Sequence, residues 1–193
     1  LMAKLGIKHY RFSIAWPRII PHGRGSVNEQ GVDFYKRLVE CLAQNGITPH
    51  ATLFHWDSPQ ALEDLYGSWQ SRQMAFDYAE YVNAIVSRLG DRITHWLTIN
   101  EIPCFTHMGY AARKPFSLIN ILGKSFQMTL GRYLPIPGKL RRLYQEPPHA
   151  PGKGVNSSQE VWQTSHHALL AHGLGCQAIR AASPVPCSVA LVD

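Results

Sequence analysis

An amide and a carboxyl stand side by side at Asn100 and Glu101, where the apolar segment 93–100 ends. If this segment is a buried strand, the carboxyl that follows it lies in partly desolvated surroundings. Burial disfavours the charged form of a carboxyl, and a carboxyl that keeps its proton can donate it to a leaving-group oxygen. The neighbouring amide can hydrogen-bond a hydroxyl group. By spacing alone, a glutamate at the start of a helix explains the pair at least as well.

A second polar group closes the preceding apolar segment, where His55, Trp56 and Asp57 follow residues 47–54. An imidazole can bond hydroxyls, and an indole can cover the apolar face of a ring, so His55 and Trp56 fit a sugar pocket. A core histidine and a core tryptophan are the simpler alternative. Arg11 also lies inside an apolar segment. A charge there needs a partner, which predicts a nearby carboxylate, either in a structural ion pair or in a site.

The sequence gives little indication of metal binding, redox chemistry, nucleotide binding or serine hydrolysis. His166, His167 and His172 are not three or four residues apart, so they do not stack on one helix face as metal ligands would. The four cysteines are scattered, without C-x-x-C spacing, which argues against a zinc ribbon or a redox motif. No G-x-G-x-x-G or G-x-x-x-x-G-K-[ST] motif follows the first expected strand, which weakens a nucleotide-binding function, and G-x-S-x-G does not occur. We expect no metal and no organic cofactor.

The elements that must position these residues follow from periodicity and turn signals. We expect strands over 9–16, 47–56, 93–100 and 187–192, and helices over 33–45, between Ser71 and Gly90, and over 159–182. Strands that alternate with helices predict parallel βαβ units. A doubly wound open sheet and a closed (β/α)₈ barrel both fit this order. Polar and aromatic residues at the strand ends favour the barrel, whose enzymes keep their chemistry there.

Composition limits the class of protein. Hydrophobic residues make up 45% of the chain and charged residues 17%, which favours a packed core over disorder. The net charge of +6 arises between Arg113 and Glu146, which hold seven basic residues and one acid, while the rest is balanced at 12 and 12. We therefore expect no nucleic-acid and no membrane partner. The start lacks the apolar stretch of a secretory signal, and we expect a cytoplasmic protein.

Six blocks resemble family 1 glycoside hydrolases, and they occur in the family's order. They are 10–19 (YRFSIAWPRI), 52–62 (TLFHWDSPQAL), 90–96 (GDRITHW), 98–101 (TINE), 150–152 (APG) and 166–172 (HHALLAH). The resemblance covers nearly all of the chain except 113–148. It implies an incomplete TIM (β/α)₈ barrel with about half of the barrel present. Residues 1–193 would then form a partial catalytic domain, with a basic insertion at about 113–148 above the barrel mouth.

The resemblance also implies roles for individual residues. The chain would belong to a retaining β-glycosidase, a hydrolase that acts on β-glucosides or β-galactosides and binds a small-molecule β-glycoside or oligosaccharide. Glu101 would be the catalytic acid/base, and Asn100 would bind the 2-hydroxyl of the sugar. His55 would bind another hydroxyl, with Trp56 beside it. Arg11 would support the nucleophile's carboxylate, which in retaining enzymes stands about 5 Å from the acid/base.

The sequence departs from the family in several places. Ile102 stands where the family has proline, and Pro103 follows. The family's N-terminal strand with its sugar-binding glutamine has no counterpart, and neither does the segment that carries the nucleophile. We therefore expect that these residues alone do not turn over glycosides. Two alternatives stay open. One is a non-catalytic glycan-binding or receptor-like relative, and the other is a different barrel glycosidase of the same clan.

Overall fold

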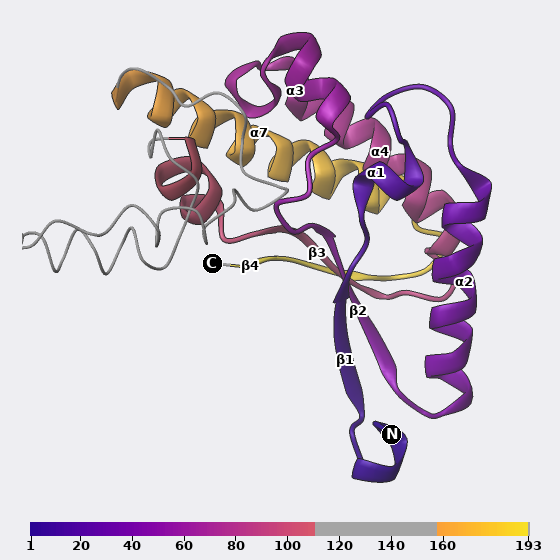
Figure 1. Ribbon diagram of the computed structural model, residues 1–193. Coiled ribbons are helices and arrows are strands. Elements are labelled where there is room, and N and C mark those ends of the chain that lie inside the picture. The colour runs from indigo at the N-terminus through magenta and orange to yellow at the C-terminus, as the bar shows by residue number, and fades with distance from the viewer. Residues whose placement is uncertain (111–157, 193) are drawn as a thin grey trace, which may run out of the picture.

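A parallel sheet of four strands organises the molecule, whose computed structural model describes residues 1–110 and 158–192 (Figure 1). The strands are β1 (His9–Ser13), β2 (Thr48–Phe54), β3 (His95–Asn100) and β4 (Ser188–Val192), and they lie side by side in chain order. A doubly wound sheet reverses its strand order at a switch point, whereas this sheet winds in one direction as a (β/α)₈ barrel does. The prediction of barrel-type parallel strands is confirmed. The predicted insertion at 113–148 lies outside the described residues.

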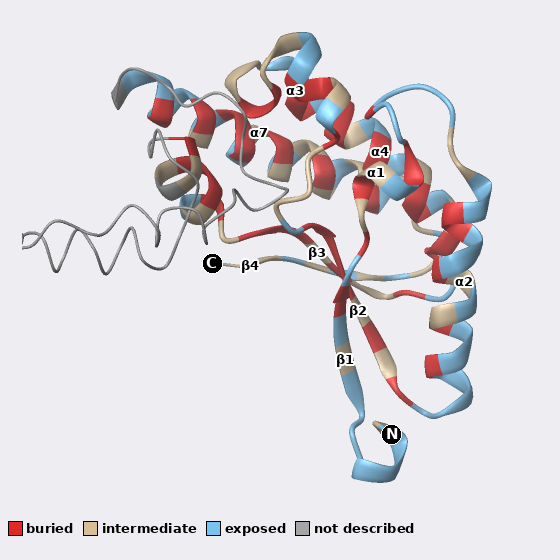
Figure 2. Ribbon diagram, in the orientation of Figure 1, coloured by how far each residue is buried: buried red, intermediate tan, exposed pale blue. Residues whose placement is uncertain are grey.

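Three long helices connect these strands and cover one face of the sheet (Figure 1). They are α2 (Glu29–Gln44), α4 (Gln73–Leu89) and α7 (Ser158–Ala182). Figure 2 shows buried residues running along the helices where they meet the sheet and each other. The core combines Val39 and Leu42 of α2 with Val82, Ile85 and Val86 of α4, all of them buried. Among the described residues, no helix combines the length and the apolarity that a membrane span requires.

Short elements occupy the connections. They are the 3₁₀ segments η1 (Ala3–Leu5) and η2 (Ser68–Gln70), the short helices α1 (Trp16–Ile19) and α3 (Gln60–Tyr66), and the π-helical segment η3 (Cys104–Tyr110). The strand expected over 9–16 ends at Ser13 because α1 begins at Trp16. Pro17 lies in the first turn of α1, where its missing N–H costs no helical hydrogen bond.

The helix expected from residue 33 begins earlier, at Glu29. Gly31 disfavours a helix by propensity, so a sequence-based start falls after it. The structure shows why a glycine stands there. A Cβ on Gly31 would lie 2.2 Å from the carbonyl oxygen of Arg18. Only a residue without a side chain therefore lets α2 approach the α1 segment so closely.

Two tyrosines of α4 tie the carboxyl ends of three strands together. The Tyr78 hydroxyl donates to the carbonyl oxygen of Thr98 at 2.6 Å, and the Tyr81 hydroxyl lies 3.0 Å from that of Ile14 and 2.9 Å from that of Leu53. Burial raises the pKa of both hydroxyls, so they remain protonated donors. One helix therefore fixes the edge of the sheet at which the predicted site residues stand.

Candidate active site

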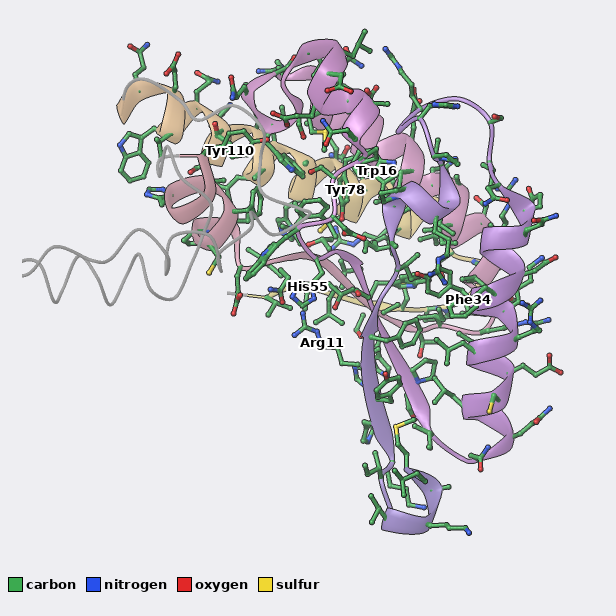
Figure 3. The ribbon with its side chains drawn as sticks, in the orientation of Figure 1. Arg11, Trp16, Phe34, His55, Tyr78 and Tyr110 are labelled. Atoms are coloured by element: carbon green, nitrogen blue, oxygen red, sulfur yellow. The ribbon has the colours of Figure 1, made fainter. Side chains whose placement is uncertain are left out.

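The predicted site residues come from three neighbouring strands and meet at the carboxyl edge of the sheet. Arg11 lies in β1, His55 and Trp56 follow β2, and Asn100 ends β3 with Glu101 directly after it. Figure 3 shows Arg11 and His55 close together on the side of the sheet away from the long helices. Since the carboxyl ends of parallel strands share one edge, residues that are far apart in the sequence are collected there.

Arg11 connects β1 to the other two strands. Its Nε donates to Thr52 Oγ1 at 2.9 Å, and its Nη2 donates to Asn100 Oδ1. A guanidinium only donates, so Asn100 must turn its side-chain oxygen toward Arg11. Asn100 is a residue only 3% exposed. Its amide nitrogen is thereby turned away from Arg11 and can donate to a ligand.

Glu101 is held by its backbone between β4 and the helical turn that follows. Its N–H donates to the carbonyl oxygen of Val192 at 2.7 Å, and its own carbonyl oxygen accepts from the N–H of Cys104 at 3.0 Å. Its φ of 46° lies in the left-handed region, which is uncommon for a residue with a side chain. Ile102, where the family has proline, is buried and begins the helical turn.

Trp56 follows β2 with a φ of 70°. Its indole Nε1 donates to the carbonyl oxygen of Asn100 at 2.9 Å, which joins the ends of β2 and β3. The Trp56 and His55 rings meet edge to face, with centroids 5.4 Å apart. Asp57 accepts a hydrogen bond from the backbone N–H of His55 at 3.3 Å and so shapes the turn that presents both rings.

The charges of Arg11 and Glu101 both act on His55. Burial and the positive charge of Arg11 lower the pKa of His55, and the negative charge of Glu101 opposes them. The net direction is downward, so the imidazole is neutral at neutral pH. A neutral imidazole has one donor and one acceptor nitrogen, which suits a hydroxyl group. The carboxyl and the guanidinium thus both lie near enough to the imidazole to affect its protonation.

The other predicted histidines do not come together. His167 Nδ1 lies 3.0 Å from the carbonyl oxygen of Trp69, and His172 Nδ1 lies 2.8 Å from Thr98 Oγ1. Each of these two rings thus has a hydrogen-bond partner within the protein. Within residues 1–110 and 158–192, no group of three or more histidine, cysteine or acidic side chains is arranged to hold a metal ion.

Sequence reasoning missed two contributors to the site. Thr52 supports Arg11 from the neighbouring strand, and the alternation of side chains along β2 could have indicated it, because every second residue shares a face. The contact of Trp56 with the Asn100 carbonyl joins residues 44 positions apart. Neither residue type nor spacing signals such a contact.

Comparison with known proteins finds a matching family model and similar proteins. The sequence model described as "Glycosyl hydrolase family 1" matches residues 1–117. "Beta-glucosidase 6" of Oryza sativa subsp. japonica is 39% identical over 180 residues, which cover 93% of this chain and 30% of that protein. "Cyanidin 3-O-glucoside 7-O-glucosyltransferase (acyl-glucose)" of Delphinium grandiflorum is 39% identical over 187 residues, covering 93% and 31%.

The fold of a solved structure matches that of this protein over nearly the whole chain. The β-glucosidase from Thermotoga maritima in complex with deoxynojirimycin superposes with a TM-score of 0.72 at 30% sequence identity, covering 98% of this chain and 34% of that one. The chain thus spans about a third of the length of the proteins it matches.

Proposed function

This chain belongs to glycosyl hydrolase family 1, and from that premise we propose that it carries the acid/base side of a retaining β-glycosidase. The substrates are β-glucosides or β-galactosides. The observation that supports this function is that Asn100, which Arg11 and Trp56 both bond, is followed directly by Glu101 at the edge where His55 also stands. A carboxyl at the carboxyl end of a barrel strand is where barrel enzymes keep catalytic groups.

Each residue has a step in the proposed reaction. Glu101 protonates the glycosidic oxygen as the bond to the leaving group breaks, and then removes a proton from the water that completes hydrolysis. Asn100 donates from its amide nitrogen to the sugar 2-hydroxyl, because Arg11 holds its oxygen. His55 bonds a second hydroxyl in its neutral form, and the Trp56 ring lies beside it.

A retaining reaction needs a second carboxylate, about 5 Å from the first, that forms the covalent glycosyl-enzyme. The proposal places this nucleophile outside the described residues and assigns Arg11 to hold it. Arg11 is suited to that role because its two hydrogen-bond partners, Thr52 and Asn100, are neutral. Its positive charge can therefore stabilise an incoming carboxylate.

The proposal is tested by turnover of an aryl β-glucoside by the protein that contains these residues. Glu101→Gln should lower the rate by about 10²- to 10⁴-fold, the usual contribution of a general acid/base. Glu80→Gln, an exposed carboxyl on α4, is the control and should leave the rate unchanged. Equal rates for wild type and Glu101→Gln would contradict the assignment. Sugar binding without turnover would instead support a glycan-binding relative.

A separate assay of residues 1–193 by themselves tests the location of the nucleophile. We expect no turnover. Turnover that Glu101→Gln abolishes would show that these residues already supply both carboxyls.

Glucosyl transfer is a second candidate, because a relative of equal similarity is named a glucosyltransferase. The glycosyl-enzyme of a retaining mechanism can pass its sugar to a hydroxyl acceptor in place of water. Chromatography of the products formed with a phenolic acceptor separates the two outcomes. Free sugar alone supports hydrolysis, and a new glucoside as the main product supports transfer.

A further inference from the structure

We infer that Trp56 is a positioning residue that aims the Glu101 carboxyl, through the hydrogen bond from its indole N–H to the Asn100 carbonyl oxygen. The inference rests on the proposed function, because aiming matters only if Glu101 transfers a proton. It gives Trp56 a role apart from contact with the sugar, since the indole N–H is already donated within the protein.

The backbone at both residues is unusual. Trp56 has a φ of 70° and Glu101 a φ of 46°. A residue with a side chain in this region is strained and persists only where its surroundings hold it. The two residues follow neighbouring strands, and the bond of 2.9 Å from Trp56 Nε1 to the Asn100 carbonyl oxygen connects Trp56 to the peptide that precedes Glu101. Two left-handed residues are therefore linked to each other at the site.

The bond acts on the peptide unit that precedes the Glu101 side chain. The carbonyl oxygen of that unit, from Asn100, accepts from Trp56, and its N–H, from Glu101, donates to Val192 in β4 at 2.7 Å. The following peptide is held as well, because the Glu101 carbonyl oxygen accepts from Cys104 at 3.0 Å. With both peptide planes fixed, φ and ψ of Glu101 are fixed, and so is the direction of its Cα–Cβ bond.

Asn100 is thus held in two places. Arg11 bonds its side chain and Trp56 bonds its main chain. The first contact orients the amide toward the sugar 2-hydroxyl, and the second orients the next residue toward the leaving group. Loss of the indole N–H should therefore disturb proton donation more than sugar binding.

The variant Trp56→Phe keeps an aromatic ring and removes the donor. Its control is Trp16→Phe, because Trp16 Nε1 also donates to a backbone carbonyl oxygen, that of Gly23 at 3.1 Å, which does not belong to the peptide beside Glu101. We compare kcat/KM for two aryl β-glucosides, one with an acidic phenol that leaves unaided and one with a weakly acidic phenol that needs the proton. A misplacement of about 1 Å can cost about 100-fold.

For Trp56→Phe we expect a loss of about tenfold or more on the weakly acidic phenol and at least fivefold less loss on the acidic one. For Trp16→Phe the two losses should be equal. Equal losses for Trp56→Phe would overturn the inference while leaving the proposed function in place. Both variants are made in the protein that carries these residues together with the nucleophile, and no turnover by that wild-type protein with either substrate would mean that the proposed function itself has failed.

A second measurement does not depend on activity. In the ¹⁵N-labelled protein, the indole N–H of Trp56 should exchange with solvent much more slowly than that of Trp162, which is 65% exposed. The signal is assigned by its loss in Trp56→Phe. Exchange as fast as that of Trp162 would show that the bond is absent and would overturn the inference even for an active enzyme.

Discussion

The face of the sheet away from the long helices carries two groups of polar side chains, at different positions along the strands. The two groups, here called levels, differ in charge. Near the carboxyl edge, at the proposed catalytic level, the Arg11 side chain reaches from the middle of β1 to Thr52 and Asn100, and His55 and Glu101 follow the ends of β2 and β3. Nearer the amino ends, His9, His50 and His95 form a row across β1, β2 and β3. His9 Nδ1 lies 3.2 Å from His50 Nε2, and the rings of His50 and His95 stack at 4.4 Å.

The charges that act on the histidines show what this difference means. Burial lowers the pKa of His50, and the neighbouring His95 and His9 lower it further. His55 also has a lowered pKa, but the Glu101 carboxylate opposes the shift. A level that contains an acid, a cation and a neutral imidazole can move a proton between groups. A level built from bases alone affects mainly the response of stability to pH.

The strongest test of this contrast is Asn100→Ala, which removes a group that belongs only to the catalytic level. We expect kcat/KM for a β-glucoside to fall by about 100-fold or more, because hydrogen bonds to the 2-hydroxyl strengthen in the transition state. For the matching 2-deoxy-glucoside the loss should nearly vanish. Thr52→Val, which removes the other partner of Arg11, should affect both substrates alike. The same loss on both substrates for Asn100→Ala would remove its assigned role.

Arg11→Met tests whether the catalytic level also holds the strands together. The buried acceptors Thr52 and Asn100 would lose their donor, so the free energy of unfolding should fall by about 1–3 kcal/mol. Denaturant unfolding measures it. Arg92→Met is the control, because Arg92 is exposed and contacts its neighbour Asp91, and its effect should stay within about 0.5 kcal/mol. Equal effects would mean that Arg11 does not connect the strands.

Tyr81→Phe tests how much the helix α4 contributes to holding the strand ends in place. The Tyr81 hydroxyl supports the ends of β1 and β2 beneath the catalytic level. Its removal should reduce the free energy of unfolding by about 0.5–1.5 kcal/mol. The half-exposed ring of Tyr10 provides the control, Tyr10→Phe, for which we expect a smaller change. A change no larger than that of the control would show that this hydroxyl does not support the strand ends.

The histidine row should give the smallest effect, visible in the pH dependence of stability. Between pH 6.5 and the lowered pKa of His50 in the fold, the unfolded chain binds more protons at this residue than the folded chain does. Stability therefore falls as the pH decreases through that interval. His50→Phe, which keeps a stacked ring, should flatten this dependence in unfolding measured from pH 7.5 to 5, and His166→Gln should leave it unchanged. A dependence as steep in His50→Phe as in the wild type would contradict the account.

Much of this arrangement could be predicted from the sequence. Apolar segments alternating with amphipathic helices indicated parallel strands, and parallel strands bring their carboxyl ends to one edge. That reasoning alone placed Arg11, His55 and Glu101 on neighbouring strands. The assignment of roles came from the resemblance of the blocks around these residues to a family, because spacing could not separate a catalytic glutamate from an ordinary one.

The remainder depends on contacts that a sequence does not encode locally. The left-handed backbones of Trp56 and Glu101 have no signal, because such positions are expected at glycine. The early start of α2 depends on how closely Gly31 approaches Arg18. In both cases a tertiary contact overrides the local preference of the residue. The predicted basic insertion at 113–148 stays a prediction, since it lies outside the described residues.

The most direct test of the central claim is the dependence of the Glu101→Ala rate on the leaving group. If Glu101 donates the proton, the variant should lose about 10²- to 10⁴-fold on an aryl β-glucoside with a weakly acidic phenol. It should lose far less on the bond-cleaving step for one with a strongly acidic phenol, measured in a single turnover. Equal losses on the two substrates would contradict the assignment of Glu101 as the general acid.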